Sequence, residues 1–206
     1  MGLSQRRDES RSVRRNKSRK IERFLSSAEL RRLGEVLEAD QSVEGSLRST
    51  VAAAVTLLLL TGCRASEVAG LQWPDVRGNR LKLRDSKTGP RTVWLGDDAR
   101  TVLDALPRSR NIPWLFWNSE RRAPLLKLSN YWPSIRDRAG LSNVRLHELR
   151  HTFASHAAMN NETLSMIGRL LGHRSLGATS RYAHLGDEHV SNATQQIGSA
   201  IEQLLM

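Results

Sequence analysis

The chain of 206 residues has very little cysteine and no long hydrophobic run, and both shortages exclude classes of protein. Its single cysteine, Cys63, excludes an intramolecular disulfide and a zinc finger built on cysteines, and its apolar neighbours favour a small core residue over a nucleophile. No apolar stretch approaches the roughly 18–20 residues that a membrane-spanning helix needs. The N-terminus is charged, but no apolar segment follows it, so it does not have the pattern of a secretory signal. We therefore expect a cytoplasmic protein, or one associated with the nucleoid, with no membrane partner.

Acidic side chains are scarce relative to basic ones. The sequence has 21 Asp and Glu against 32 Lys and Arg, a formal net charge of +11. Residues 1–20 contain eight basic and two acidic side chains, which accounts for +6 of that total and leaves +5 for the rest of the chain. Because the excess extends over both parts, it favours a polyanionic partner, most simply nucleic acid. The alternative is a soluble protein with a basic tail.

The chain divides near residue 25. Residues 1–25 are rich in Arg, Ser and Lys and contain almost nothing to bury, which predicts a flexible basic tail or linker. Residues 26–206 predict one domain, because a chain of this length builds one sizeable core. Ser26 and Glu29 have the spacing of a capping box, so a first amphipathic helix is expected to begin there.

Most of this domain predicts helices. The stretch from Leu47 to Leu60 is apolar and rich in alanine, which is typical of a buried helix, and Gly62 suits a left-handed C-terminal cap. Arg64 is then expected beside that cap, followed by a short helix that carries Glu67. Four further helices are predicted before the last one: from the cap Asp97 or Asp98 to Leu106, from Ser129 to Ala139, from Leu146 to Met159, and from Leu164 to Leu171 after the cap Thr163. A final helix is predicted from Glu188 to Leu205. Its apolar stripe consists of Val190, Ile197, Ile201 and Leu204.

Residues 73–95 change character, because β-branched and aromatic residues alternate there with charged ones. Gly78-Asn79 is predicted to join two strands and residues 87–90 a second pair, which places Lys87 at or beside a hairpin tip. Residues 113–117 (PWLFW) predict a core segment rather than a platform for stacked bases. The fold class expected is therefore α+β, mainly α, with a small antiparallel sheet of about three strands packed on a helical core.

The string HELRH, residues 147–151, fits the zinc-protease signature and has to be tested against it. A zinc site needs a third protein ligand. The extended pattern would place that ligand at Ala157, which cannot bind metal, and Glu162 has no supporting pattern. Arg150 would also bring a cation next to the metal. The sequence therefore predicts no metal at this site.

A phosphate site is the better interpretation of the same residues. Arg64 and Arg150 are two arginines whose planar forks match the oxygens of a phosphodiester. Nearby histidines can donate hydrogen bonds or move protons near neutral pH, and a flexible lysine is a plausible acid for a departing alkoxide. Tyr182 would be the nucleophile, since a phenol can form a reversible phosphate ester once it is activated. Each of these residues alone is weak evidence, and the ordered set is much stronger.

The segments TGCRASEV, SKTGPRTVWL, HELRHTFASH and LGHRSLGATSRYAH together resemble the tyrosine recombinase, or phage integrase, family from about Ile21 to the C-terminus. The resemblance implies a site-specific recombinase or integrase that breaks and rejoins double-stranded DNA through a 3′-phosphotyrosyl intermediate. It also implies that no metal or nucleotide cofactor is needed, and the sequence has no nucleotide-binding P-loop.

The resemblance assigns a role to each residue of the set. Arg64 and Arg150 would bind the scissile phosphate, and Tyr182 would attack it. The remaining roles implied are those of Lys87, which protonates the leaving 5′-oxygen, His147, which handles a proton, His173, which donates a hydrogen bond, and Glu67, which supports the first arginine.

The chain departs from the family in one respect, because a helical DNA-clamping domain usually precedes the catalytic one, and only the basic tail stands there. We expect weak DNA affinity and site selection without it. The last helix resembles the segment that family members dock on a neighbouring protomer of a tetrameric synapse, and packing on its own domain, as a monomer, is the alternative. Two other functions stay open: a type IB topoisomerase-like enzyme and a DNA-binding remnant without cleavage activity.

Overall fold

The structure is a computed structural model that describes residues 23–84 and 89–205, and of residues 186–193 only the backbone. The α-helices of the described chain are α1 (Ser27–Gln41), α2 (Leu47–Thr61), α3 (Ala65–Ala69), α4 (Asp97–Asp104), α5 (Trp132–Arg138), α6 (Glu148–Met159), α7 (Leu164–Leu171) and α8 (Asp187–Leu205). The strands are β1 (Val76–Arg77), β2 (Arg80–Leu83), β3 (Arg91–Trp94), β4 (Trp117–Asn118) and β5 (Ala123–Pro124). Short 3₁₀ segments are η1 (Trp73–Asp75), η2 (Leu128–Asn130), η3 (Leu176–Ala178) and η4 (Ser180–Gly186). The predicted fold class, mainly helical with a small antiparallel sheet, is confirmed.

The first two helices begin and end at the residues that the sequence indicates. Ser26 and Glu29 form the capping box of α1, and Gly62 ends α2 with a left-handed φ of 61°. Packed structure begins slightly before the boundary expected at residue 25. Leu25 is fully buried, and its backbone N–H donates to the Thr152 hydroxyl at 3.0 Å. The rest of the predicted tail lies outside the described residues, apart from residues 23 and 24.

Two small sheets follow, and only one of them was expected. β1, β2 and β3 form the predicted antiparallel sheet, with Gly78 at a positive φ of 57° in the first turn and Arg80 opposite Trp94 across the strands. The Arg80 guanidinium covers the Trp94 ring at 4.0 Å from its centroid, which organises the solvent face of the pair. β4 and β5 form a second, two-stranded sheet that the sequence did not predict. Leu115 and Phe116 lie in the core, as expected for the segment 113–117.

At the starts of α4 and α5 the structure differs from the prediction in the residues that begin the helix. The expected cap of α4 by Asp97 or Asp98 is wrong, because Gly96 is the N-cap and both aspartates lie in the first turn, where they face the positive end of the helix dipole. The predicted helix from Ser129 is replaced by η2 followed by α5, which starts at Trp132 with Pro133 in its first turn. Proline fits there because the first turn has no partner for its missing N–H.

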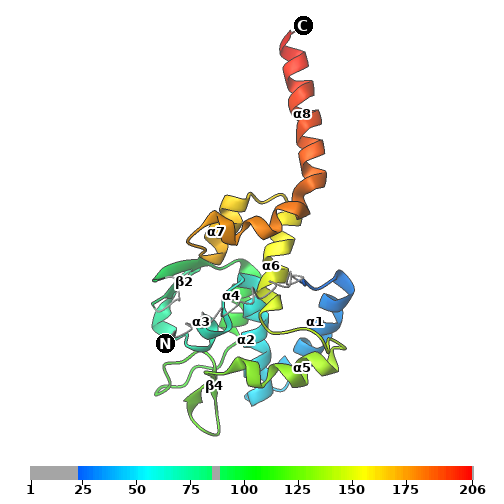
Figure 1. Cartoon of the computed structure of the whole chain (residues 1–206). Helices are drawn as coiled ribbons and strands as arrows, with labels where there is room; N and C mark the ends of the chain where they lie inside the picture. The colour runs from blue at the N-terminus through cyan, green and yellow to red at the C-terminus, as the bar shows by residue number, and fades with distance from the viewer. Residues whose placement is uncertain (1–22, 85–88, 206) are drawn as a thin grey trace, which may run out of the picture.

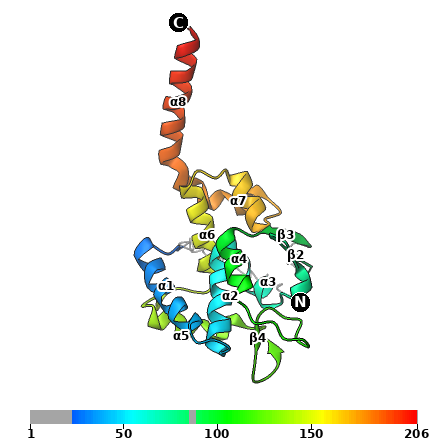
Figure 2. The ribbon, with the colours of Figure 1, turned by 180° about the vertical axis from the view of Figure 1, so that it is seen from behind.

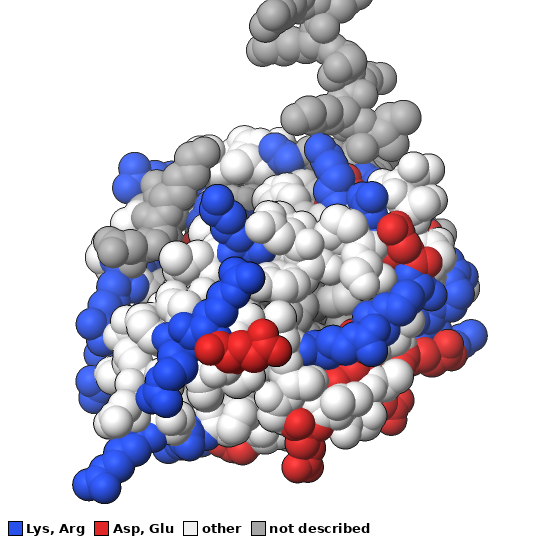
Figure 3. All heavy atoms as spheres, turned by 90° about the horizontal axis from the view of Figure 1, so that it is seen from below, with Lys and Arg blue, Asp and Glu red and all other residues white. Residues whose placement is uncertain are grey.

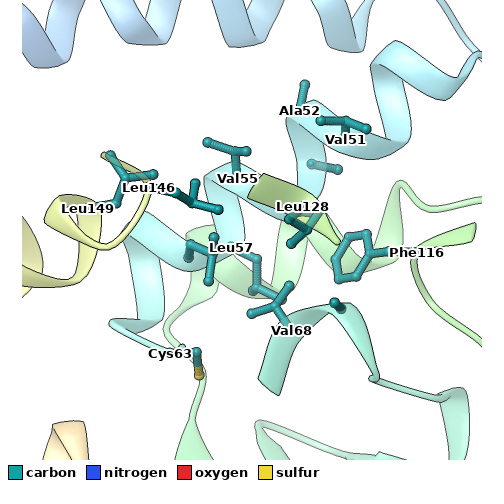
Figure 4. Close-up of a cluster of buried hydrophobic side chains, with 14 of the residues drawn as sticks. Val51, Ala52, Val55, Leu57, Cys63, Val68, Phe116, Leu128, Leu146 and Leu149 are labelled. Carbon is teal, nitrogen blue, oxygen red and sulfur yellow. The ribbon is translucent and has the colours of Figure 1, made fainter. Parts of the chain in front are cut away.

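Helices α2 and α6 run through the middle of the molecule (Figures 1 and 2). In both views α1 and α5 lie on one flank and the three-stranded sheet lies on the other. Figure 4 shows how the core joins these parts: Val55 and Leu57 of α2 belong to one cluster with Leu149 of α6, Val68 of α3 and Phe116. This continuous core fixes α2, α3 and α6 relative to one another, and the candidate site is built on the ends of these helices.

The described side chains of the last helix, from residue 194 to residue 205, are exposed. In Figure 1, α8 extends away from the body and carries the C-terminus to its far end. Ile197, Ile201 and Leu204 of the predicted apolar stripe are 60%, 52% and 86% exposed, whereas the Val190 side chain lies outside the described ones. Over the described side chains, packing of this helix on its own domain is therefore not observed. Among the described residues no helix combines the length and the apolar character needed to cross a membrane.

Candidate active site

Arg64 lies where α2 ends and α3 begins. Gly62 turns the chain there at its positive φ, and a Cβ at this position would lie 2.5 Å from Cδ1 of Phe153, so both conformation and space require glycine. Arg64 is then the N-cap residue of α3. Its Nη1 donates to Oε1 of Glu67 at 2.8 Å, and its backbone N–H donates to Oε2 at 2.8 Å. The turn and the carboxylate together fix both ends of this arginine.

Glu67 is a buried carboxylate held between two arginines. Its side chain is 2% exposed, and besides Arg64 it binds Arg91, whose Nη2 donates to Oε2 at 2.8 Å. Burial raises the pKa of Glu67, but the hydrogen bonds from Arg91 and from the Arg64 backbone outweigh it and keep that pKa below its ordinary value. Glu67 is therefore ionised at neutral pH and anchors two cations.

Arg150 connects the ends of two helices from a buried position on α6. Its Nη1 donates to the Gly62 carbonyl at 2.7 Å, and its Nη2 donates to the Leu171 carbonyl at 2.8 Å, at the C-terminus of α7. Burial, and then the positive charges of Arg64 and Arg91, lower the pKa of Arg150 to about 10. It therefore remains a cation at neutral pH and adds a second positive charge beside Arg64.

Two histidines complete the cluster around these arginines. His147 is the N-cap of α6, and partial burial together with the charge of Arg150 lowers its pKa. His173 follows Gly172, the left-handed C-cap of α7, and its Nδ1 lies 2.8 Å from the Thr179 hydroxyl. Burial and then Arg150 lower the pKa of His173 to about 4. Both imidazoles are therefore neutral at pH 7 and can accept or donate a hydrogen bond.

Tyr182 reaches this cluster through a third histidine. It lies in η4 and is 3% exposed, and its hydroxyl is 2.7 Å from Nδ1 of His151. The rings of His151 and His147 meet edge to face with their centroids 4.8 Å apart. Burial, and then the nearby His147, lower the pKa of His151 to about 4. A neutral imidazole therefore holds the phenol hydroxyl at the edge of the site.

A second hydrophobic cluster packs around the tyrosine ring. It is separate from the main core and contains Ala154 and Ala158 of α6 with Ile167 and Leu171 of α7. These side chains come from the same two helices that carry Arg150 and lead to His173. The ring of Tyr182 is thus enclosed by the elements that build the rest of the site.

The predicted site residues are described by the structure with one exception. Arg64, Glu67, His147, Arg150, His173 and Tyr182 come from separated segments, and the hydrogen bonds and charge effects given above join them. Lys87 lies outside the described residues. Figure 3 shows Lys and Arg side chains spread over one face of the molecule with acidic side chains between them, so the positive charge on that face is not one uninterrupted patch.

Two side chains of the HELRH segment, Glu148 and His151, form hydrogen bonds within the protein. Glu148 is buried and accepts hydrogen bonds from the backbone and side chain of Arg145, while His151 binds Tyr182. Within residues 23–84 and 89–205, no group of three His, Cys, Asp or Glu side chains is arranged to hold a metal ion.

The sequence interpretation missed two residues that contact the site. Arg91 carried a usable signal: it stands two positions before the buried Val93 on β3, so strand alternation turns it inward. His151 was part of the HELRH segment considered in the sequence, but its partner Tyr182 is 31 residues away, and no sequence pattern joins them.

The sequence pattern of the Phage integrase family matches residues 23–189, most of the chain. The chain belongs to the phage integrase family. This confirms the resemblance noted in the separated motifs, and all of the predicted site residues fall inside the matched range.

Curated and structural relatives agree with the phage integrase family. The tyrosine recombinase XerD of Brucella suis is 33% identical over 170 residues, which cover 75% of this chain and 55% of XerD. The chain therefore spans little more than half the length of that relative. The crystal structure of XerA recombinase superimposes with a TM-score of 0.67 at 27% identity, covering 84% of this chain and 62% of XerA. The catalytic domain of bacteriophage HP1 integrase gives a TM-score of 0.63 at 28% identity, covering 84% of this chain and 93% of that domain.

Proposed function

We propose that the chain is the catalytic part of a site-specific DNA recombinase or integrase that cuts and rejoins double-stranded DNA by transesterification. One observation carries the proposal. Two buried or half-buried arginines, Arg64 and Arg150, lie among neutral histidines, and a tyrosine hydroxyl is hydrogen-bonded to one histidine of the same cluster. This set of groups suits attack of a phenol on a phosphodiester, and membership of the phage integrase family supports it.

In the proposed reaction, the Tyr182 oxygen forms a bond to the scissile phosphorus while the bond from phosphorus to the 5′-oxygen breaks. The phenol proton passes to the neutral imidazole pair His147 and His151. Arg64 and Arg150 stabilise the extra negative charge of the pentacoordinate phosphorus, and loss of either is expected to lower the rate roughly 100- to 1,000-fold. Lys87 protonates the leaving 5′-oxygen, and the phosphotyrosine keeps the energy of the broken bond for the rejoining step.

Glu67 and His173 complete the proposed set of roles. Glu67 holds Arg64 in place without contacting DNA, as its two hydrogen bonds to that arginine indicate. His173 donates a hydrogen bond to a phosphate oxygen, and the Thr179 hydroxyl orients its ring. The proposal includes no cofactor.

Double-stranded DNA is the proposed partner, in the cytoplasm or nucleoid. The net charge of +11 supports it, and affinity should fall steeply as salt is added because bound phosphates release counterions. We also propose that the chain self-associates on DNA. The exposed apolar side chains of α8, a helix that projects from the body, support docking on a neighbouring copy.

A pool of nicked duplexes with a randomised central segment tests the proposal. The nick lets a short strand diffuse away after cleavage, so that a covalent adduct accumulates and is resolved on a denaturing gel. Tyr182→Phe should abolish the adduct and leave non-covalent binding intact, because only the hydroxyl is lost. Tyr131, the other tyrosine of the sequence, provides the matched control: Tyr131→Phe should form the adduct at the wild-type rate.

Three outcomes separate the proposal from its rivals. An adduct that persists in Tyr182→Phe shows that the nucleophile is wrongly assigned. A wild-type protein that binds the duplexes but forms no adduct is a DNA-binding protein without cleavage activity. Relaxation of a supercoiled circle without strand exchange between paired sites, once a duplex has been selected from the pool, identifies a topoisomerase-like enzyme instead.

A further inference from the structure

Arg91 opens strand β3, but its guanidinium lies inside the protein, with the side chain only 10% exposed. Its Nη2 donates to Oε2 of Glu67 at 2.8 Å, and its Nη1 donates to the Leu170 carbonyl at 3.0 Å near the end of α7. Nη2 also lies 3.7 Å from Sγ of Cys63. One side chain therefore connects the sheet, helix α3 and the C-terminus of α7.

The end of α7 is shaped to admit this arginine. Gly172 has a φ of 66°, and a Cβ added to it would lie 2.5 Å from Cδ and 2.9 Å from Nε of Arg91. His173 follows directly. The stem of Arg91 thus occupies the space that any other residue at position 172 would need, and the guanidinium is fixed by packing as well as by hydrogen bonds.

The charges around Glu67 make Arg91 important for more than packing. A buried carboxylate has to be paired with a cation. If Arg64 were the only cation bound to Glu67, the two charges would cancel and the pair would have no net charge. With Arg91 present, two cations share one anion, so the trio keeps a net positive charge. The effect of Arg91 extends into the site: burial is the main cause of the lowered pKa of Arg150 and of His173, and the positive charge of Arg91 adds to both shifts.

We propose that Arg91 is a positioning residue of the cleavage site, which neutralises Glu67 and so leaves the charge of Arg64 available to the scissile phosphate. By binding the Leu170 carbonyl it also holds strand β3 against the segment that leads to His173. This inference rests on the proposed function. It adds to Arg64 and Arg150 a third arginine, which is buried and acts through Glu67 without contacting DNA.

Replacement of Arg91 should therefore affect the cleavage rate and not DNA binding. In Arg91→Met the rate of adduct formation at saturating duplex should fall about 10- to 100-fold, somewhat less than for a direct donor to the transition state. The dissociation constant for the selected duplex should stay within about twofold, because the buried side chain is not a phosphate contact. Equal losses in rate and binding would overturn the proposal, and so would a rate unchanged from wild type.

A second substitution tests how Arg91 acts. If it neutralises Glu67, then Glu67→Gln in the Arg91→Met background removes the negative charge that would otherwise hold Arg64 in a neutral pair, and it should recover about tenfold in rate. A purely structural arginine predicts no recovery, since the double variant then lacks both partners. Arg138→Met is the matched control, because Arg138 also pairs with a buried carboxylate, Asp40, but on the α1–α5 flank. Arg138→Met should lose about as much thermal stability as Arg91→Met, but it should keep the wild-type cleavage rate.

The titration of His173, followed by NMR without DNA, separates this inference from the proposed function. Loss of the Arg91 charge should move the His173 titration to higher pH in Arg91→Met, whereas Arg91→Lys should keep it close to wild type. An unmoved titration in Arg91→Met overturns the electrostatic role even if cleavage is impaired. Absence of any adduct in the wild-type protein, with the titration shifted as expected, rejects the DNA-cleaving function alone.

Discussion

Acidification from pH 7 to pH 4.5 should destabilise the fold through His151, the histidine that holds Tyr182. Burial lowers the pKa of His151 from an ordinary value of 6.5 to about 4 in the folded protein. As the pH falls below 6.5, the unfolded chain takes up a proton at this residue and the folded chain does not. The free energy of unfolding therefore decreases between about pH 6.5 and 4, and the contribution levels off below that.

The size of the effect follows from the two pKa values. Each pKa unit corresponds to about 1.4 kcal/mol, so the full difference sets an upper limit of about 3.4 kcal/mol for His151. Solvent still reaches part of its surroundings and screens the interaction, which reduces the expected loss at pH 4.5 to about 2 kcal/mol. His173 has the same sign of shift and adds to the total in the wild-type protein.

Urea unfolding at pH 7.0 and at pH 4.5, compared between wild type and His151→Asn, measures this contribution. Asparagine cannot titrate in this range, and its side chain can still reach the Tyr182 hydroxyl from the position of Nδ1. The variant should lose about 2 kcal/mol less than wild type between the two pH values. His184→Asn, at an exposed histidine of η4, should behave as wild type. Equal losses in wild type and His151→Asn would refute the argument.

Two further predictions concern stability at pH 7, measured by urea unfolding. Gly62→Ala should cost about 2 kcal/mol or more, because alanine is strained at a φ of 61° and its Cβ would clash with Cδ1 of Phe153. A loss below about 0.5 kcal/mol would show that the turn adapts. Thr152→Val should cost about 1–3 kcal/mol, since it removes the hydroxyl that accepts the backbone N–H of the buried Leu25. A loss below about 0.5 kcal/mol would show that the Leu25 N–H does not depend on this hydroxyl.

The sequence predicted the helix ends better than the contacts between them. Gly62 and Thr163 were identified as caps because capping depends on local backbone geometry, and both have that role in the structure. Asp97 and Asp98 were wrongly assigned as candidate caps, because a glycine cap and an acidic first turn give nearly the same local pattern. Such ambiguity shifts a boundary without changing the fold.

The site shows where sequence reasoning stops. Arg64 and Arg150 could be chosen because motifs surround them. What brings Arg150 close to Arg64 is its hydrogen bond to the carbonyl of Gly62, and this contact depends on how α2 and α6 pack. The contact between His151 and Tyr182 joins two distant segments, and no local pattern could predict it. Arg91 was visible only as an inward strand position, and its partner Glu67 is 24 residues away.

Cys63 makes the protein a convenient subject for thiol chemistry. Its side chain is buried at 1% exposure, burial raises the pKa of its thiol, and Nη2 of Arg91 lies against its sulfur. Alkylating reagents should reach Cys63 only when the packing around it and Arg91 opens, so the rate at which Cys63 is modified measures that opening. Because Cys63 is buried and is the one cysteine of the sequence, a fluorophore can be attached selectively at an introduced surface cysteine while Cys63 is kept.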